Sequence, residues 1–134
     1  PALIDGSSGD AISYAELGIK AKRLASGLSK RGFKPGEVLG IFSPNCPEYG
    51  IIFHGVILAG GTNTTVNPLY TAKELSKQLN DCQARFLICH SSCFTLLSYL
   101  WDDRDPQLSS ESWCHSGLHV PIRSGAVSGF NAEA

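Results

Sequence analysis

The chain has 134 residues, 43% of them hydrophobic and 17% charged, and its formal net charge at pH 7 is −1. This length and composition are typical of a single globular domain with a core of its own. Acidic and basic residues are interspersed along the sequence, so we expect no basic face of the kind that binds nucleic acid or an anionic membrane.

Neither a membrane span nor a signal peptide is expected. No apolar run reaches the roughly 18 residues that cross a bilayer, and the opening PALIDGSSGD lacks the basic start and apolar stretch of a signal peptide. We therefore expect an intracellular protein. The sequence contains no methionine and begins at Pro1 inside a predicted strand, which indicates a fragment whose natural N-terminus is missing.

The first third of the chain predicts a hairpin, a helix and a strand. The runs ALI and AISY flank DGSSGD, as in a β-hairpin. Ser13 and Glu16 have the spacing of a capping box, which marks the start of a helix. The apolar stripe of this helix comprises Leu17, Ala21, Leu24 and Leu28. Gly32 is its expected C-terminal cap, and residues 38–42 (VLGIF) follow as a strand.

A second helix is expected from NCPEYGIIFHGVILAGG. Asn45 and Glu48 have capping-box spacing, and Pro47 is tolerated in a first turn. Residues 46–58 are apolar nearly all round, which predicts a helix buried on most sides. The pair Gly60-Gly61 ends the helix, and TNTTV (62–66) follows as a strand.

Thr71 and Glu74 mark the start of a third helix. Its narrow apolar stripe comprises Leu75, Leu79 and Cys82, and its water-facing residues are expected to be Lys73, Lys77, Gln78 and Asp81. Residues 85–89 (RFLIC) follow as a strand. Strands that alternate with helices in this way predict an α/β fold with βα units of a parallel sheet.

The glycines ahead of the third helix raise the question of phosphate binding. Gly55 and Gly60 have the glycine spacing of a Walker-type loop, and Gly61 and Thr62 stand where lysine and Ser/Thr belong. The match fails at its charged residue, because Gly61 replaces the lysine. These glycines also follow a helix rather than a strand, which places them at a negative helix end. A helix stop followed by a strand is therefore the better interpretation.

A zinc site is not supported by the cysteines. The chain has five of them, an odd number at irregular spacing that indicates free thiols: Cys46, Cys82, Cys89, Cys93 and Cys114. Cys82, Cys89, His90 and Cys93 lie within twelve positions, but they form no C-x-x-C pair. We expect these cysteines to be small buried side chains.

Two further groups of polar residues have ordinary explanations. His54 lacks a Ser, Cys or carboxylate placed by spacing as a partner, so a packed or hydrogen-bonded histidine is expected. Asp102, Asp103 and Asp105 are spaced as in a calcium loop, but the required glycine and distal glutamate are missing, since Glu111 does not fill that place. A solvated acidic turn is expected, and we assign no catalytic, cofactor-binding or metal-binding residue.

The sequence resembles a known family over residues 1–93. The run GEVLGIFSPNCPEYGIIFHGVILAGGTNTTVNPLYTAKELSKQL, with PALID and SYAELGIKAKRLASGLSKRG before it, is similar to the N-terminal region of AMP-forming acyl-adenylate synthetases. It looks most like 4-coumarate:CoA ligases of plants and their peroxisomal relatives. Residues 94–134 are serine-rich without helical or strand periodicity. We interpret them as an irregular, out-of-family tail that arose by frameshift, intron retention or mis-predicted splicing.

The resemblance implies a ligase that uses ATP and Mg²⁺ to join a carboxylic acid to AMP, and then transfers the acyl group to coenzyme A. Its phosphate loop ending in Pro-Lys-Gly, its adenylate motifs and its catalytic lysine are absent here, so the chain alone is expected to be inactive. The parent family implies a cytosolic or peroxisomal location. The chain ends in Ala132, Glu133 and Ala134, without a peroxisomal tripeptide.

Two alternatives remain open at this point. The βα alternation would also suit a stand-alone flavodoxin-like or Rossmann-like nucleotide-binding module, although no G-x-G-x-x-G follows a strand. The chain could instead be a non-catalytic interaction fragment that pairs with a full-length synthetase, or with itself, through an exposed sheet edge.

Overall fold

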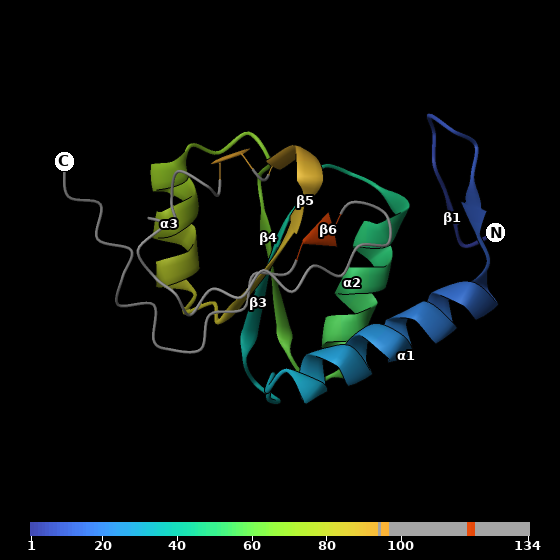
Figure 1. The fold of residues 1–134 in the computed structure, drawn as a ribbon, viewed down its shortest axis with the longest axis horizontal. Coiled ribbons are helices and arrows are strands. Elements are labelled where there is room, and N and C mark those ends of the chain that lie inside the picture. The colour runs from blue at the N-terminus through green and yellow to red at the C-terminus, as the bar shows by residue number, and fades with distance from the viewer. Residues whose placement is uncertain (94, 97–117, 120–134) are drawn as a thin grey trace. The chain divides into compact units, whose positions relative to one another are not determined.

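The computed structural model describes residues 1–93, 95–96 and 118–119 (Figure 1). These residues form two compact units. The first comprises residues 1–37 and 45–63, and the second comprises residues 38–44 and the described residues from 64 onward. Among the described residues, no helix is both long enough and apolar enough to cross a bilayer.

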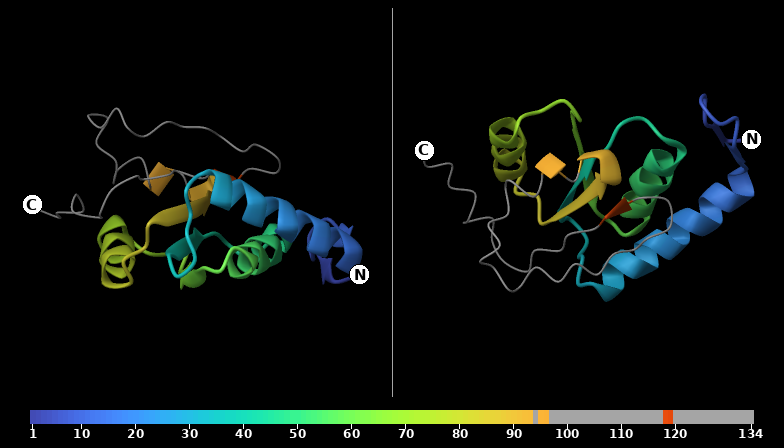
Figure 2. Two further views of the ribbon diagram at one scale, coloured as in Figure 1. Left: turned by 90° about the horizontal axis from the view of Figure 1, so that it is seen from below. Right: turned by 45° about the horizontal axis from the view of Figure 1, so that its top comes forward.

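The first unit contains a hairpin and two packed helices. Its elements are β1 (Leu3–Ile4), β2 (Ala11–Ile12), α1 (Tyr14–Lys30) and α2 (Pro47–Leu58). The strands pair antiparallel, as expected. The two helices lie side by side in every view of Figures 1 and 2. They approach closely because Gly55 has no side chain: a Cβ atom there would lie 2.7 Å from Cδ2 of Leu24.

The start of α1 confirms the predicted capping box. The Ser13 hydroxyl accepts the Glu16 backbone N–H at 3.2 Å, and Glu16 Oε2 accepts the Ser13 backbone N–H at 2.8 Å. Ala21 and Leu28 of the expected stripe are buried, while Leu17 and Leu24 are half-buried. Gly32 follows the last turn at φ 85°, as a glycine cap should.

The predicted cap of α2 was wrong. Its N-cap is Cys46, which makes no side-chain capping bond, and the helix begins at Pro47. Proline disfavours helical geometry in the residue before it, and Cys46 is accordingly extended at φ −149° and ψ 160°. Asn45 therefore lies one position too early to cap the helix, although its spacing from Glu48 is correct.

The burial predicted for α2 was also wrong. Ile52, Gly55 and Val56 are buried, but Phe53, Ile57 and Leu58 remain 37%, 51% and 55% exposed. The uniform hydrophobicity of the sequence could not show which face of the helix this chain covers.

The second unit is built on a sheet with strand order β4-β3-β5-β6. The strands are β3 (Val38–Phe42), β4 (Thr62–Val66), β5 (Phe86–His90) and β6 (Leu118–His119). β3 and β5 run parallel, with Leu39 opposite Phe86, and β6 is antiparallel to β5. The predicted α/β class with a parallel sheet is confirmed, and the last predicted strand lies one residue further along than expected.

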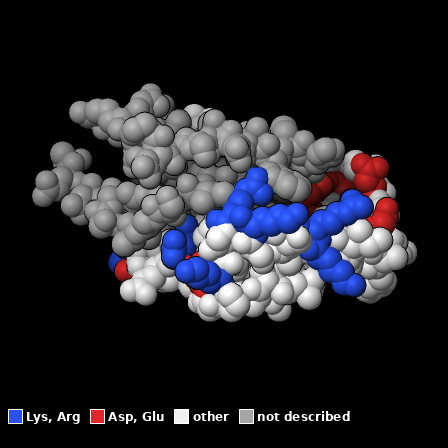
Figure 3. All heavy atoms as spheres, turned by 60° about the horizontal axis from the view of Figure 1, so that its bottom comes forward, with Lys and Arg blue, Asp and Glu red and all other residues white. Residues whose placement is uncertain are grey.

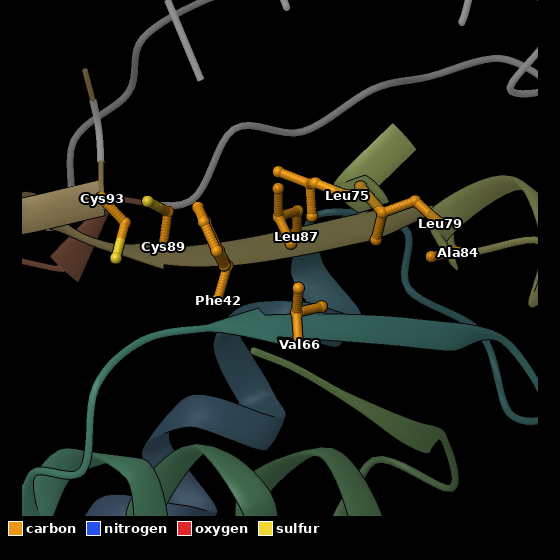
Figure 4. Packing of buried hydrophobic residues seen from close by; sticks show 8 residues of the cluster. All are labelled: Phe42, Val66, Leu75, Leu79, Ala84, Leu87, Cys89 and Cys93. Atoms are coloured by element: carbon orange, nitrogen blue, oxygen red, sulfur yellow. The ribbon is translucent and has the colours of Figure 1, made fainter. Parts of the chain in front are cut away.

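Helix α3 (Ala72–Asp81) packs on this sheet over Gly40. A Cβ atom on Gly40 would lie 2.8 Å from Cδ1 of Leu87 and 2.9 Å from Cδ2 of Leu79, so a side chain there would force these leucines to shift. Figure 4 shows the core that results. Its buried members are Phe42, Val66, Leu75, Leu79, Ala84, Leu87, Cys89 and Cys93.

Gln78 does not face water as predicted. It is half-buried, and its Nε2 donates to Thr64 Oγ1 at 2.9 Å and to the Thr65 carbonyl at 3.0 Å. This amide ties α3 to the strand that precedes it. Hydrophobic periodicity alone cannot identify such a contact, because its partner is brought close only by the fold.

Helices α1, α2 and α3 each end in the same left-handed turn. The residue just beyond each cap has a positive φ: 85° at Gly32, 78° at Gly60 and 54° at Gln83. The next residue donates its N–H to the carbonyl five positions earlier, as in the bond of 2.9 Å from Ala84 to Leu79. The chain therefore reverses at each helix end and enters the following strand.

Charged residues are distributed differently from our expectation. No acidic residue occurs between Glu16 and Glu37, whereas six basic residues do. Five of these are exposed: Lys20, Lys22, Arg23, Lys30 and Lys34. Figure 3 shows Lys and Arg side chains gathered on one face. The expectation of interspersed charge was wrong here, because a near-neutral total conceals a local run of one sign.

Gln83 is the one non-glycine residue at positive φ in the described part of the chain. Replacing Gln83 by glycine is expected to raise the free energy of unfolding by about 0.5–1 kcal/mol, because a side chain in this conformation crowds its own backbone. Urea unfolding followed by circular dichroism measures the change. The reciprocal substitution, Gly60→Ala, should lower stability, and a destabilised Gln83→Gly variant would contradict this account.

Candidate functional site

The glycine run before β4 has no amide available for a phosphate. The Gly60 and Gly61 N–H groups donate to carbonyls of α2 at 2.9 Å each, and the Thr62 N–H donates to the Glu37 carbonyl at 2.9 Å. A phosphate cradle requires several N–H groups that point at the ligand. The interpretation of this run as a helix stop followed by a strand is thus supported by its hydrogen bonds.

Each glycine of the pair has a separate structural role. Gly60 supplies the left-handed backbone that ends α2. Gly61 supplies space, because a Cβ atom there would lie 2.3 Å from Cζ of Phe33, which is itself buried. The two neighbouring glycines, which suggested a nucleotide loop, therefore permit a turn and a close contact.

The segment from β4 to α3 is also engaged with itself. The Asn67 side chain accepts the Leu69 N–H at 3.0 Å, which forms the turn. At the start of α3, Glu74 Oε2 accepts both the N–H and the hydroxyl of Thr71, each at 2.8 Å. The predicted capping box is confirmed. The chain's own carboxylate thus occupies a helix N-terminus that would otherwise favour an anion.

The capping carboxylates are held in their ionised form. The backbone N–H of Thr71, and then its hydroxyl, lower the pKa of Glu74 below its ordinary value. The backbone N–H of Ser13, followed by its hydroxyl, does the same for the pKa of Glu16. Both carboxylates are solvent-exposed, so their role is to fix helix starts rather than to transfer protons.

Cysteine and histidine at the end of β5 do not form a reactive centre. Cys89 is fully buried, and this burial, together with the nearby Cys93, raises the pKa of its thiol to about 12. A thiol in this state is a poor nucleophile and a poor metal ligand. Cys82 is half-buried at the C-terminal cap of α3.

Sequence reasoning missed the contact between His90 and Ser92. The Ser92 N–H donates to His90 Nδ1 at 3.2 Å, and the Ser92 hydroxyl lies 2.8 Å from the same nitrogen. Nδ1 is therefore an acceptor, which places the proton of a neutral ring on Nε2. Because a backbone N–H shares this nitrogen, the pair caps the short turn η1 (Ser91–Cys93). The i to i+2 spacing was the available signal.

Of the remaining candidate residues, His54 is described by the structure and the others are not. His54 is exposed on α2. Its ring centroid lies 5.9 Å from that of Phe53 in an edge-on contact, so the expected packing is only partial. Asp102, Asp103, Asp105, Glu111 and Cys114 lie outside the described residues. Within the described part, no group of three or more His, Cys, Asp or Glu side chains could hold a metal ion.

Comparison with known proteins decides the family. The profile described as "AMP-binding enzyme" matches residues 1–120. The chain belongs to the AMP-binding enzyme family. Among curated relatives, it is 39% identical over 103 residues to 4-coumarate–CoA ligase 3 of Arabidopsis thaliana. That match covers 77% of this chain but only 18% of the relative. The expected boundary at residue 93 remains a prediction.

Solved structures of acyl-CoA ligases share the fold. The N-terminal domain of FACL13 from Mycobacterium tuberculosis matches with a TM-score of 0.70 at 23% identity, over 77% of this chain and 26% of that one. ATP-bound MatB from Rhodopseudomonas palustris matches with a TM-score of 0.63 at 29% identity, over 69% and 18%. The described units therefore correspond to a small part of a much longer fold.

The family uses ATP and coenzyme A, but the described residues do not fit a nucleotide. The glycine amides are engaged, Glu16 and Glu74 occupy two helix starts, and no acidic cluster for magnesium is found in the described part.

The glycine pair provides a stability test. Replacing Gly61 by alanine is expected to lower the free energy of unfolding by about 1–3 kcal/mol, because the new methyl group meets the Phe33 ring. The matched control is Gly18→Ala in α1, where nothing lies within 4 Å of the added carbon. That change should stabilise the chain by about 0.5–1 kcal/mol. Chemical unfolding of both variants checks the signs, and equal effects would refute the steric explanation.

The capping carboxylates predict an acid-sensitive component of stability. A carboxylate whose pKa is lowered on folding contributes stability above its unfolded pKa and loses that contribution as the pH falls through the folded value. The double variant Glu16→Gln, Glu74→Gln should therefore be less stable than the parent at neutral pH. The difference should shrink as the pH falls below 4.5, the ordinary value for glutamate. Urea unfolding at several pH values measures it, and a constant difference would argue against this origin.

Proposed function

We propose that this chain is part of an ATP-dependent carboxylic acid–CoA ligase of the 4-coumarate type, acting on a phenylpropanoid acid or a fatty acid. The observation that carries the proposal is the 39% identity with a 4-coumarate–CoA ligase over 103 residues, which is 77% of this chain. Other relatives of the same name match at 33–38% identity. No observation on the described residues favours a stand-alone flavodoxin-like or Rossmann-like module.

The role that fits the described residues is structural. Their polar side chains close turns, cap helices and tie elements together, as Gln78 does between α3 and β4. In an intact ligase these βα units would support segments that lie elsewhere in the enzyme. We propose that the 134-residue chain does not adenylate an acid by itself.

Exchange of labelled pyrophosphate into ATP tests this proposal. With 4-coumarate as the acid, the chain alone is expected to give no exchange above a protein-free control. Exchange that depends on both the chain and the acid would overturn the proposed inactivity.

A chimera tests the structural role. Residues 1–93 would replace the aligned segment of Arabidopsis thaliana 4-coumarate–CoA ligase 3, and the chimera is expected to retain CoA ligation. A second chimera carrying Gly40→Val should lose activity, because the added side chain meets Leu79 and Leu87. A third carrying Gly18→Ala should remain active. An inactive but folded first chimera would contradict the proposal.

A further inference from the structure

The exposed surface of α1 carries a stripe of basic residues. At 100° per residue, Lys20, Arg23 and Lys30 fall within about 80° of one another around the helix and extend about 15 Å along it. Lys22 on the same helix and Lys34 in the loop after it add further charge. The five residues, which we call the basic stripe, are all exposed. No ion pair is recorded for any of them in the described part of the chain.

The basic stripe lies opposite the apolar face of α1. That face is already occupied inside the first unit, where Leu24 sits against Gly55 of α2 and Leu28 is buried. The one acidic residue of the helix, Glu16, lies a turn before Lys20. The Ser13 backbone N–H, then the Ser13 hydroxyl and last Lys20 lower the pKa of Glu16. The Glu16 carboxylate is engaged by Ser13, so it caps the helix start rather than neutralising the stripe beyond it.

An apolar side chain lies within this charged surface. Ile19 is 52% exposed. Lys22 and Arg23 lie three and four residues after it on the helix, so these two cations are its neighbours on the surface. An isoleucine beside these cations gains nothing from a soluble polyanion. It gains from a bilayer surface, where the lysines meet anionic headgroups while the apolar group enters the acyl boundary.

We propose that the basic stripe of α1 is a docking surface for an anionic phospholipid membrane. The partner's chemistry follows from three observations. The surface is the outer ridge of a packed helix, which suits a plane better than a groove-filling peptide. Four of its five cations are lysines, point charges without the bidentate geometry that base recognition uses. Ile19 supplies the apolar component. The helix itself does not insert, because its apolar face is occupied.

The expected binding to an anionic membrane is weak. Each basic residue close to an anionic leaflet raises partitioning about fivefold, and five together support weak, reversible and salt-dependent attachment. This inference does not depend on the proposed ligase activity, since it rests on the charge and exposure of α1 alone.

Vesicle co-sedimentation of the full chain tests the proposal. Binding is expected to vesicles with about 30% phosphatidylserine in phosphatidylcholine, and not to phosphatidylcholine alone. Raising the salt from about 0.05 M to about 0.5 M should release the chain, because screening shortens the range of the attraction. Equal binding to both vesicle types would overturn the proposal.

Matched variants locate the surface. Lys22→Glu with Lys30→Glu should weaken binding at least about twentyfold. Lys73→Glu with Lys77→Glu makes the same change of net charge on α3, where both lysines are exposed, and should leave binding within about twofold of the parent. Ile19→Ser should weaken binding severalfold while preserving its salt dependence. Equal losses of binding for the two charge variants would show that binding depends on net charge alone, and would overturn the assignment of the surface to α1.

Competition distinguishes the other class of partner. Heparin and single-stranded RNA, added at matched charge, are expected to compete weakly with anionic vesicles. If either binds the chain more tightly than the vesicles do, and the Lys22 and Lys30 changes abolish that binding, the stripe serves a soluble polyanion and the membrane proposal is wrong. Circular dichroism of every variant, including a neutral Lys22→Gln, Lys30→Gln pair, confirms that the helices remain intact.

Discussion

The left-handed turn at the end of each helix is the constraint on which the other elements depend. Gly32, Gly60 and Gln83 each reverse the chain, and the residue after each donates to a carbonyl five positions back. Two of those following residues, Phe33 and Ala84, are buried, so the turn also delivers an apolar group to the interior. Without a positive φ at these positions, the helices would continue and the strands would lose their starting points.

Polar side chains close to the strand ends also fix turns and helix starts. Thr71 with Glu74, Asn67, and His90 with Ser92 all satisfy backbone groups of their own segment. A side chain that caps a helix cannot at the same time present its oxygen to a ligand. The polar groups of this region are therefore engaged within the described units themselves.

Local signals were predictable where the responsible residues lie close in sequence. The boxes at Ser13 and Thr71 and the strand 38–42 followed from spacing and composition alone. Prediction failed where two local rules competed, as at Asn45, where Pro47 forced Cys46 to be extended and moved the cap. It failed again for Gln78, because its partners Thr64 and Thr65 are distant in sequence. It also failed for the charge along α1, because the net charge of the whole chain conceals a local run of basic residues.

The sequence by itself determined the order of elements, the caps of two helices, the α/β class and the resemblance to the acyl-adenylate synthetases, because each depends on residues within a few positions of one another or on a continuous motif. Only the tertiary structure decided which face of α2 is covered, why Gly40 and Gly61 must lack a side chain, and where the amides of the glycine pair donate. These depend on contacts between distant segments, such as Gly61 with Phe33, whose geometry no periodicity encodes.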